Sequence, residues 1–148
     1  MGSGSTTRIV VLDTSILLHY RLLPEIDWLE AVDAKEVEIV LTRTVISELN
    51  THKDRRASRR ESTRADTVLR YLHKVWGEEM KAEIRENVWL RREPRSPVIA
   101  FADHGLNKDV PDDWIIASAL ELHMEYGDDV LIITNDIGQE GAASALLS

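Results

Sequence analysis

Two apolar runs that end in aspartate decide how this chain folds. Ile9-Val10-Val11-Leu12 is followed by Asp13, and Val130-Leu131-Ile132-Ile133-Thr134-Asn135 is followed by Asp136. Apolar runs of this length, bounded by turn signals, are typical of strands buried in a parallel sheet. In an open parallel sheet, ligands bind outside the carboxyl ends of the strands. Asp13 and Asp136 are therefore predicted to face a common ligand site.

Segments with helical spacing separate the apolar runs. The pattern predicts strands at residues 8–12, 37–41, 88–90 and 129–134, and helices at 14–20, from about 25, at 45–49, at 64–77, at 112–126 and at 140–147. Residues 51–63 are too polar for a core and are predicted to form an exposed loop or a frayed helix, and 94–111 a long loop. Asp112 or Asp113 is expected to cap the helix that follows. Strands that alternate with helices predict an α/β fold with a parallel sheet.

The totals set the broad class of protein. With 148 residues and 43% hydrophobic content, the chain is long enough for one domain with a real core, which we expect to span residues 6–148. Residues 1–5, Met-Gly-Ser-Gly-Ser, resemble a cloning remnant and are left out of the predicted fold. No apolar run approaches the length of a membrane span. The absence of cysteine excludes disulfides and thiolate zinc sites, and it fits a reducing cytoplasm.

Charge is distributed unevenly along the chain. The net charge is −8, but residues 51–100 hold 13 of the 18 Lys and Arg and 8 of the 26 Asp and Glu, so that this part carries +5 and the rest −13. This asymmetry suggests a polyanion that is held by one part and cut at another. The candidate nucleic-acid-binding residues are Lys53, Arg55, Arg56, Arg59, Arg60 and Arg64. The alternative is a solvated segment that docks on a partner.

Two further carboxylates, Glu48 and Asp113, lie on predicted helices. Four carboxylates at one site would repel each other at neutral pH, and a hard divalent cation with oxygen ligands would neutralise them. The set therefore indicates a metal-dependent enzyme that acts on phosphate esters. Taken singly, Asp13 and Asp113 are more often helix caps, and Asp136 is more often a turn residue.

Four motifs, in this order, resemble the PIN domain. They are Val10-Val11-Leu12-Asp13-Thr14-Ser15, Val45-Ile46-Ser47-Glu48-Leu49, Asp112-Asp113-Trp114-Ile115-Ile116-Ala117-Ser118-Ala119 and Ile132-Ile133-Thr134-Asn135-Asp136. The resemblance implies a three-layer α/β/α sandwich with a central parallel sheet, and a nuclease that uses Mg²⁺ or Mn²⁺, often on RNA.

The same resemblance assigns roles to residues. Asp13, Glu48, Asp113 and Asp136 would form the metal cluster and the catalytic set, and the supporting positions would be Thr14, Ser15, Asp112, Thr134 and Asn135. Family members usually continue into a further edge strand, so the chain, which ends at Ser148, is expected to be cut from a longer protein or to lack that edge.

The function expected from the sequence is that of an endoribonuclease that cuts single-stranded RNA in the cytoplasm. Within that expectation, the chain is either the toxin of a toxin–antitoxin pair, blocked by its antitoxin, or a domain beside a neighbouring domain, and a homodimer is plausible. A structure-specific DNA nuclease and a catalytically silent binding or assembly module stay open as alternatives.

Other acidic or phosphate-binding motifs are missing. Ser15 stands where a haloacid-dehalogenase pattern needs a second Asp, and Leu17 stands where an integrin-like metal motif needs Ser. The sequence contains no Gly-x-Gly-x-x-Gly, no Gly-Lys-Ser/Thr and no His-x-x-x-His.

Overall fold

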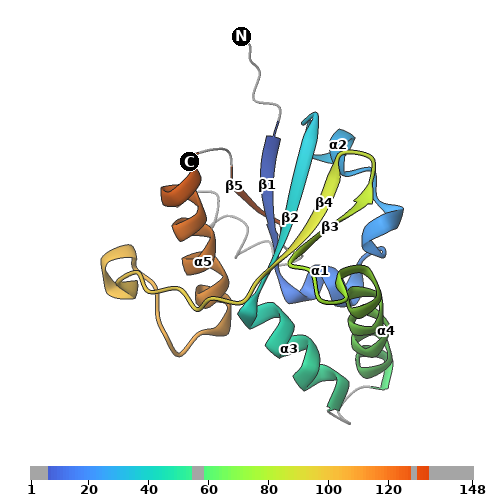
Figure 1. Cartoon of the computed structure of the whole chain (residues 1–148). Helices are drawn as coiled ribbons and strands as arrows, with labels where there is room; N and C mark the ends of the chain where they lie inside the picture. Colours follow the sequence, from blue (N-terminus) through green and yellow to red (C-terminus); the bar gives the residue numbers. More distant parts are fainter. Residues whose placement is uncertain (1–6, 55–58, 128–129, 134–148) are drawn as a thin grey trace.

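A five-stranded sheet forms the centre of the protein. The computed structural model describes residues 7–54, 59–127 and 130–133 (Figure 1). The strands are β1 (Thr7–Leu12), β2 (Glu36–Thr42), β3 (Lys81–Arg85), β4 (Val88–Glu93) and β5 (Val130–Ile133). Their order in the sheet is β3-β4-β2-β1-β5. All neighbouring pairs are parallel except β3 and β4, which are antiparallel. The α/β fold with a central, mostly parallel sheet is thus confirmed.

The central position of β1 follows from its sequence. Val10, Val11 and Leu12 are completely buried, as expected of a strand that is covered on both faces. β1 pairs with β2 on one side and with β5 on the other. After β1 the chain moves outward through β2 and later returns to the opposite side of β1, so that the order of strands reverses there. Such reversal points are where open α/β sheets bind ligands.

Within the described ranges, five α-helices flank the sheet, and two short 3₁₀ turns lie at Leu23–Glu25 and Phe101–His104. The helices are α1 (Thr14–His19), α2 (Trp28–Ala31), α3 (Arg43–Asp54), α4 (Arg59–Trp76) and α5 (Pro111–Tyr126). In Figure 1, α3 lies below the carboxyl ends of the strands, with α4 toward the β3 edge and α5 toward β5. Among the described residues, no helix is both long and apolar enough to cross a membrane.

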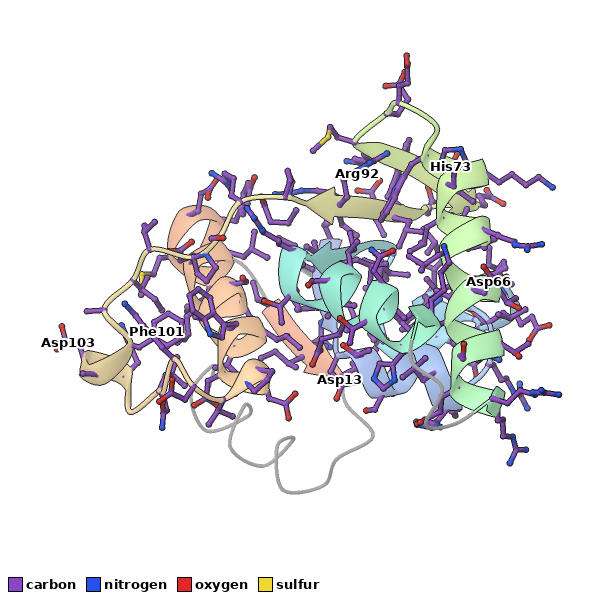
Figure 2. All side chains as sticks on the ribbon, turned by 90° about the horizontal axis from the view of Figure 1, so that it is seen from below. Asp13, Asp66, His73, Arg92, Phe101 and Asp103 are labelled. Atoms are coloured by element: carbon purple, nitrogen blue, oxygen red, sulfur yellow. The ribbon has the colours of Figure 1, made fainter. Side chains whose placement is uncertain are left out.

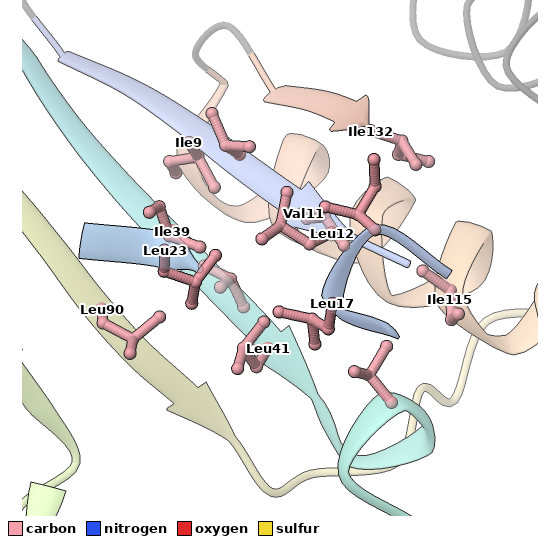
Figure 3. Packing of buried hydrophobic residues seen from close by; sticks show 14 of the residues in the cluster. Ile9, Val11, Leu12, Leu17, Leu23, Ile39, Leu41, Leu90, Ile115 and Ile132 are labelled. Atoms are coloured by element: carbon pink, nitrogen blue, oxygen red, sulfur yellow. The ribbon is translucent and has the colours of Figure 1, made fainter. Parts of the chain in front are cut away.

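Leucine, isoleucine and valine side chains from strands and helices form one core. Figure 3 shows Leu12, Leu17, Leu41 and Ile115 converging from β1, α1, β2 and α5. Each of these four side chains is at most 2% exposed. The core therefore lies directly behind the carboxyl ends of β1 and β2 and fixes the helices that follow them.

Several predicted elements differ from the structure. Residues 51–63, predicted as an exposed loop or a frayed helix, are helical where they are described, because α3 extends to Asp54 and α4 begins at Arg59. The helix predicted from about residue 25 is a 3₁₀ turn followed by a short α2, which Asp27 caps by accepting a hydrogen bond from the N–H of Glu30 at 3.3 Å. Strand β3 was not predicted, because it is polar and alternates between exposed and half-buried positions.

The cap of α5 also differs from the expectation. The N-cap residue is Val110, with no side-chain hydrogen bond, and Pro111 occupies the first helical position. Proline suits that position because it lacks an N–H that would otherwise be unpaired. Asp112 and Asp113 are therefore both inside the first turn, where their charge favours the helix dipole, and neither is the cap.

A buried carboxylate at the end of β4 binds two arginines. Glu93 is 6% exposed, and it accepts hydrogen bonds from Nη2 of Arg91 at 2.7 Å and from Nε of Arg95 at 2.9 Å. Burial alone would raise the pKa of Glu93, but the hydrogen bonds from Arg95 and Arg91 outweigh it and lower the pKa. This network holds the start of the long connection that leads to α5.

We expect Glu93→Gln to lower the free energy of unfolding at neutral pH by about 1–3 kcal/mol, because Arg91 and Arg95 lose the charged acceptor that they share. Since the folded pKa of Glu93 is lowered, its contribution is full above the unfolded pKa of about 4.3 and disappears as the pH falls through the folded pKa. Urea denaturation at a series of pH values measures this. The exposed Glu86→Gln variant serves as the control, and a loss of stability in Glu93→Gln that does not change with pH would contradict the assignment.

Candidate active site

Asp13 is held rigidly at the carboxyl end of β1. Its side chain is 3% exposed, and Oδ1 accepts a hydrogen bond from the N–H of Ile16 at 3.0 Å, which makes Asp13 the N-cap of α1. The hydroxyl of Ser15 donates to the same carboxylate at 3.0 Å. The N–H of Asp13 donates to the carbonyl of Ile133 at 3.2 Å, so the end of β5 lies beside it. Asp13 can therefore cap α1 and at the same time belong to the predicted site.

Glu48 approaches from α3. The hydroxyl of Thr14, a residue that is 7% exposed, donates a short hydrogen bond to Oε1 of Glu48. Thr42 directly precedes α3, and its hydroxyl accepts a hydrogen bond from the N–H of Val45 at 3.4 Å at the start of that helix. The hydrogen bond between Thr14 and Glu48 thus joins the start of α1 to α3.

Asp112, rather than its neighbour Asp113, lines the site beside Asp13 and Glu48. A cleft of about 250 Å³, which we call the acidic cleft, is lined by Asp13, Glu48 and Asp112 together with the supporting residues Thr14 and Ser15. Asp112 and Asp113 are neighbours on a helix and point about 100° apart. Oδ2 of Asp113 accepts a hydrogen bond from the N–H of Asn107 at 2.8 Å, and Asp113 does not line the acidic cleft. Figure 2 views this region from the carboxyl ends of β1 and β2, with Asp13 between α5 and α1.

The carboxylates of the cleft influence each other. Burial is the largest cause that raises the pKa of Glu48, and the negative charges of Asp112 and Asp13 raise it further. The hydrogen bond from Thr14 and the nearby His52 act in the opposite direction without cancelling the rise. The cleft therefore concentrates negative charge at a point where burial already disfavours it.

A divalent cation fits the chemistry of these donors. All three are carboxylates, the ligands that Mg²⁺ and Mn²⁺ prefer, and their mutual repulsion would be relieved by a positive ion. In the described ranges, however, no three His, Asp or Glu side chains are gathered closely enough to ligate one ion. Thr134, Asn135 and Asp136 lie outside the described residues, so their predicted roles stay predictions from the sequence.

The sequence profile of the PIN domain matches residues 10–146. The chain belongs to the PIN domain family. PIN domains are in general metal-dependent nucleases that use divalent ions. A comparison with curated protein sequences found no match.

The predicted nucleic-acid-binding residues of this PIN domain differ in exposure and in their contacts. Lys53, Arg59 and Arg60 are exposed near the end of α3 and the start of α4, and Arg55 and Arg56 lie outside the described residues. Arg64 instead donates from Nε to the carbonyl of Leu17 at 2.9 Å and, by a short hydrogen bond, to the carbonyl of Tyr20. Arg64 thus satisfies carbonyls at the end of α1 and ties that helix to α4.

Two titratable residues of the PIN domain cleft, His19 and Glu61, were missed in the sequence, and a third, His52, was not assigned to the cleft. Nε2 of His19 and Oε2 of Glu61 are 3.0 Å apart. His52 follows Glu48 by four residues, so the two share one helix face, and this spacing was a signal that could have found it. His19 and Glu61 come together only through the packing of α1 on α4, which no local spacing reveals.

We expect Arg64→Gln to lower the free energy of unfolding by about 1–3 kcal/mol, because two carbonyls at the end of α1 lose a charged donor. Arg60→Gln, one turn earlier on α4, is expected to leave stability within about 0.5 kcal/mol, as exposed substitutions usually do. Urea denaturation of both variants measures the difference. Equal stability of the two would show that Arg64 is not the structural arginine of this pair.

Proposed function

We propose that this PIN domain is a divalent-metal-dependent endoribonuclease that hydrolyses phosphodiester bonds of single-stranded RNA at the acidic cleft. The observation that carries the proposal is the meeting of Asp13, Glu48 and Asp112, from three separate elements, in one cleft at the carboxyl end of the central strand. The preference for RNA rests on the resemblance of the motifs to PIN nucleases. The basic residues beside the cleft support a polyanionic substrate.

Asp13 and Asp112 would hold Mg²⁺ or Mn²⁺ in the cleft, with Glu48 as a further ligand or as the residue that orients water. Such an ion lowers the pKa of a bound water and stabilises negative charge on the phosphoryl oxygens. The sequence predicts Asp136 as an additional ligand.

The chain's own residues prepare this site in three ways. Ser15 and the N–H of Ile16 fix the orientation of the Asp13 carboxylate, so little reorganisation is needed when the substrate binds. Thr14 holds Oε1 of Glu48, which leaves Oε2 as the atom that can accept a hydrogen bond from the attacking water. The exposed arginines bring positive charge toward a phosphate that would otherwise be repelled.

Cleavage of labelled single-stranded RNA with Mn²⁺ tests the proposal. Wild-type protein is expected to cut, and both an EDTA control and the Asp13→Asn variant are expected not to cut. A matched single-stranded and structured DNA panel tests the alternative of a DNA nuclease. Folded protein that binds RNA but never cuts it would favour the silent binding module, and inhibition by a co-encoded protein would favour a toxin.

We also propose different roles for the two adjacent aspartates, Asp112 and Asp113. Asp112→Asn is expected to lower the cleavage rate constant by a factor on the order of 10², because it removes a carboxylate that would hold the metal ion. Asp113→Asn is expected to stay close to wild type, since an amide oxygen can still accept the hydrogen bond from Asn107. Single-turnover cleavage of RNA by the two variants measures this, and the reverse ranking would show that the cleft uses Asp113.

A further inference from the structure

The acidic cleft continues into two other hollows on different sides. One, of about 690 Å³, lies between α1 and α4, shares Leu18, His19 and Glu61 with the cleft, and contains Arg60. The other, of about 350 Å³, shares Glu48 with the cleft and lies between the start of α3 and the start of α5. We call them the Arg60 hollow and the Arg43 hollow.

Hydrogen-bond donors predominate in the Arg43 hollow. It is lined by the side chains of Arg43 and Lys108 and by the hydroxyls of Thr44, Ser47 and Ser96. Arg43, Lys108 and Ser47 are exposed to solvent, so they can reach a ligand without rearrangement. Two cations and three hydroxyls match the acceptor oxygens of a phosphate group. Asp109 and Glu48 also line this hollow and offset the two positive charges, which favours a single phosphate over a denser anion.

The position of Lys108 is fixed by α5. Its carbonyl accepts a hydrogen bond from Nε1 of Trp114 at 2.8 Å, and the preceding residue, Asn107, is held by Asp113 at 2.8 Å. The ammonium group of Lys108 lies 5.7 Å from the ring centroid of Phe101, which itself packs edge-on against Trp114. Figure 2 shows Phe101 on this side of α5. The hydrogen bond between Asn107 and Asp113, which holds Asp113 outside the acidic cleft, therefore also helps to position Lys108 at the Arg43 hollow.

The two hollows join the cleft through different elements. The Arg43 hollow meets it at Glu48 on α3, whereas the Arg60 hollow meets it at α1 and α4. Thr44 and Glu48 are four residues apart and share one helix face, so the donors of the Arg43 hollow lie one turn from the cleft. A strand that passes through the cleft can therefore contact positive side chains both before and after the bond that is cut.

We infer that the Arg43 hollow is a phosphate subsite, in which Arg43 and Lys108 bind a backbone phosphate of the RNA strand on the opposite side of the scissile bond from Arg60. The inference rests on the proposed function, because it assigns a further contact to the same substrate. With this subsite, the enzyme would contact its RNA strand on both sides of the scissile bond, which suits cleavage within a strand.

Fluorescence anisotropy of a labelled single-stranded RNA of mixed sequence, measured in EDTA at several salt concentrations, tests the subsite without any cleavage. Arg43→Gln and Lys108→Gln are each expected to weaken binding and to reduce the slope of log Kd against log salt concentration by about 0.7, the effect of one lost phosphate contact on a single strand. Lys74→Gln, an exposed lysine toward the far end of α4, is the matched control. Affinities and slopes equal to those of Lys74→Gln would overturn the inference.

Shortened RNAs test which side each cation serves. Trimming the strand from one end is expected to abolish the effect of Arg43→Gln, and trimming from the other end the effect of Arg60→Gln. Loss of both effects from the same end would overturn the two-sided arrangement. Because these measurements are made without metal, their failure is distinct from failure of the proposed nuclease, which would appear as wild-type protein that does not cut RNA with Mn²⁺.

Discussion

The carboxylate of Asp13, only 3% exposed at the carboxyl end of the central strand, is the constraint on which the rest of the site depends. A buried charge costs free energy unless it is hydrogen-bonded or paired, and here Ser15 and the N–H of Ile16 donate to it. These bonds begin α1, and they place Thr14 where its hydroxyl reaches Glu48. The start of one helix, the position of a second and the geometry of the cleft thus follow from one buried group.

Sequence patterns could locate the apolar strands but not the polar β3, and they could not give the rotation of α5. The apolar runs before Asp13 and at Val37–Leu41 predicted β1 and β2, because buried parallel strands require such runs. Asp112 and Asp113 could not be distinguished, because every residue from Ile115 to Leu120 is buried. A helix that is buried around its whole circumference has no apolar face from which to infer which aspartate faces inward. The structural contacts of Arg64 could not be predicted, because its carbonyl partners, Leu17 and Tyr20, are distant in sequence.

Neighbouring residues of the same charge make different contacts at this site. Asp112 contributes charge to the cleft, while Asp113 holds the segment that carries Lys108. On α4, Arg60 and Arg64 both line a hollow beside the cleft, and Arg64 in addition stabilises the end of α1. The net charge of −8 therefore does not argue against a nucleic-acid substrate. What matters is the local arrangement, in which cations border the carboxylates on two sides.

The central claim is that a divalent cation binds among Asp13, Glu48 and Asp112. Titration of ¹⁵N-labelled protein with Mn²⁺ tests it most directly, because the paramagnetic ion broadens the amide signals nearest to it. We predict that the signals of Ser15, Ile16, Glu48 and Asp112 broaden first in wild-type protein and that Asp13→Asn removes the effect. Broadening centred elsewhere, or unchanged by Asp13→Asn, would contradict the account.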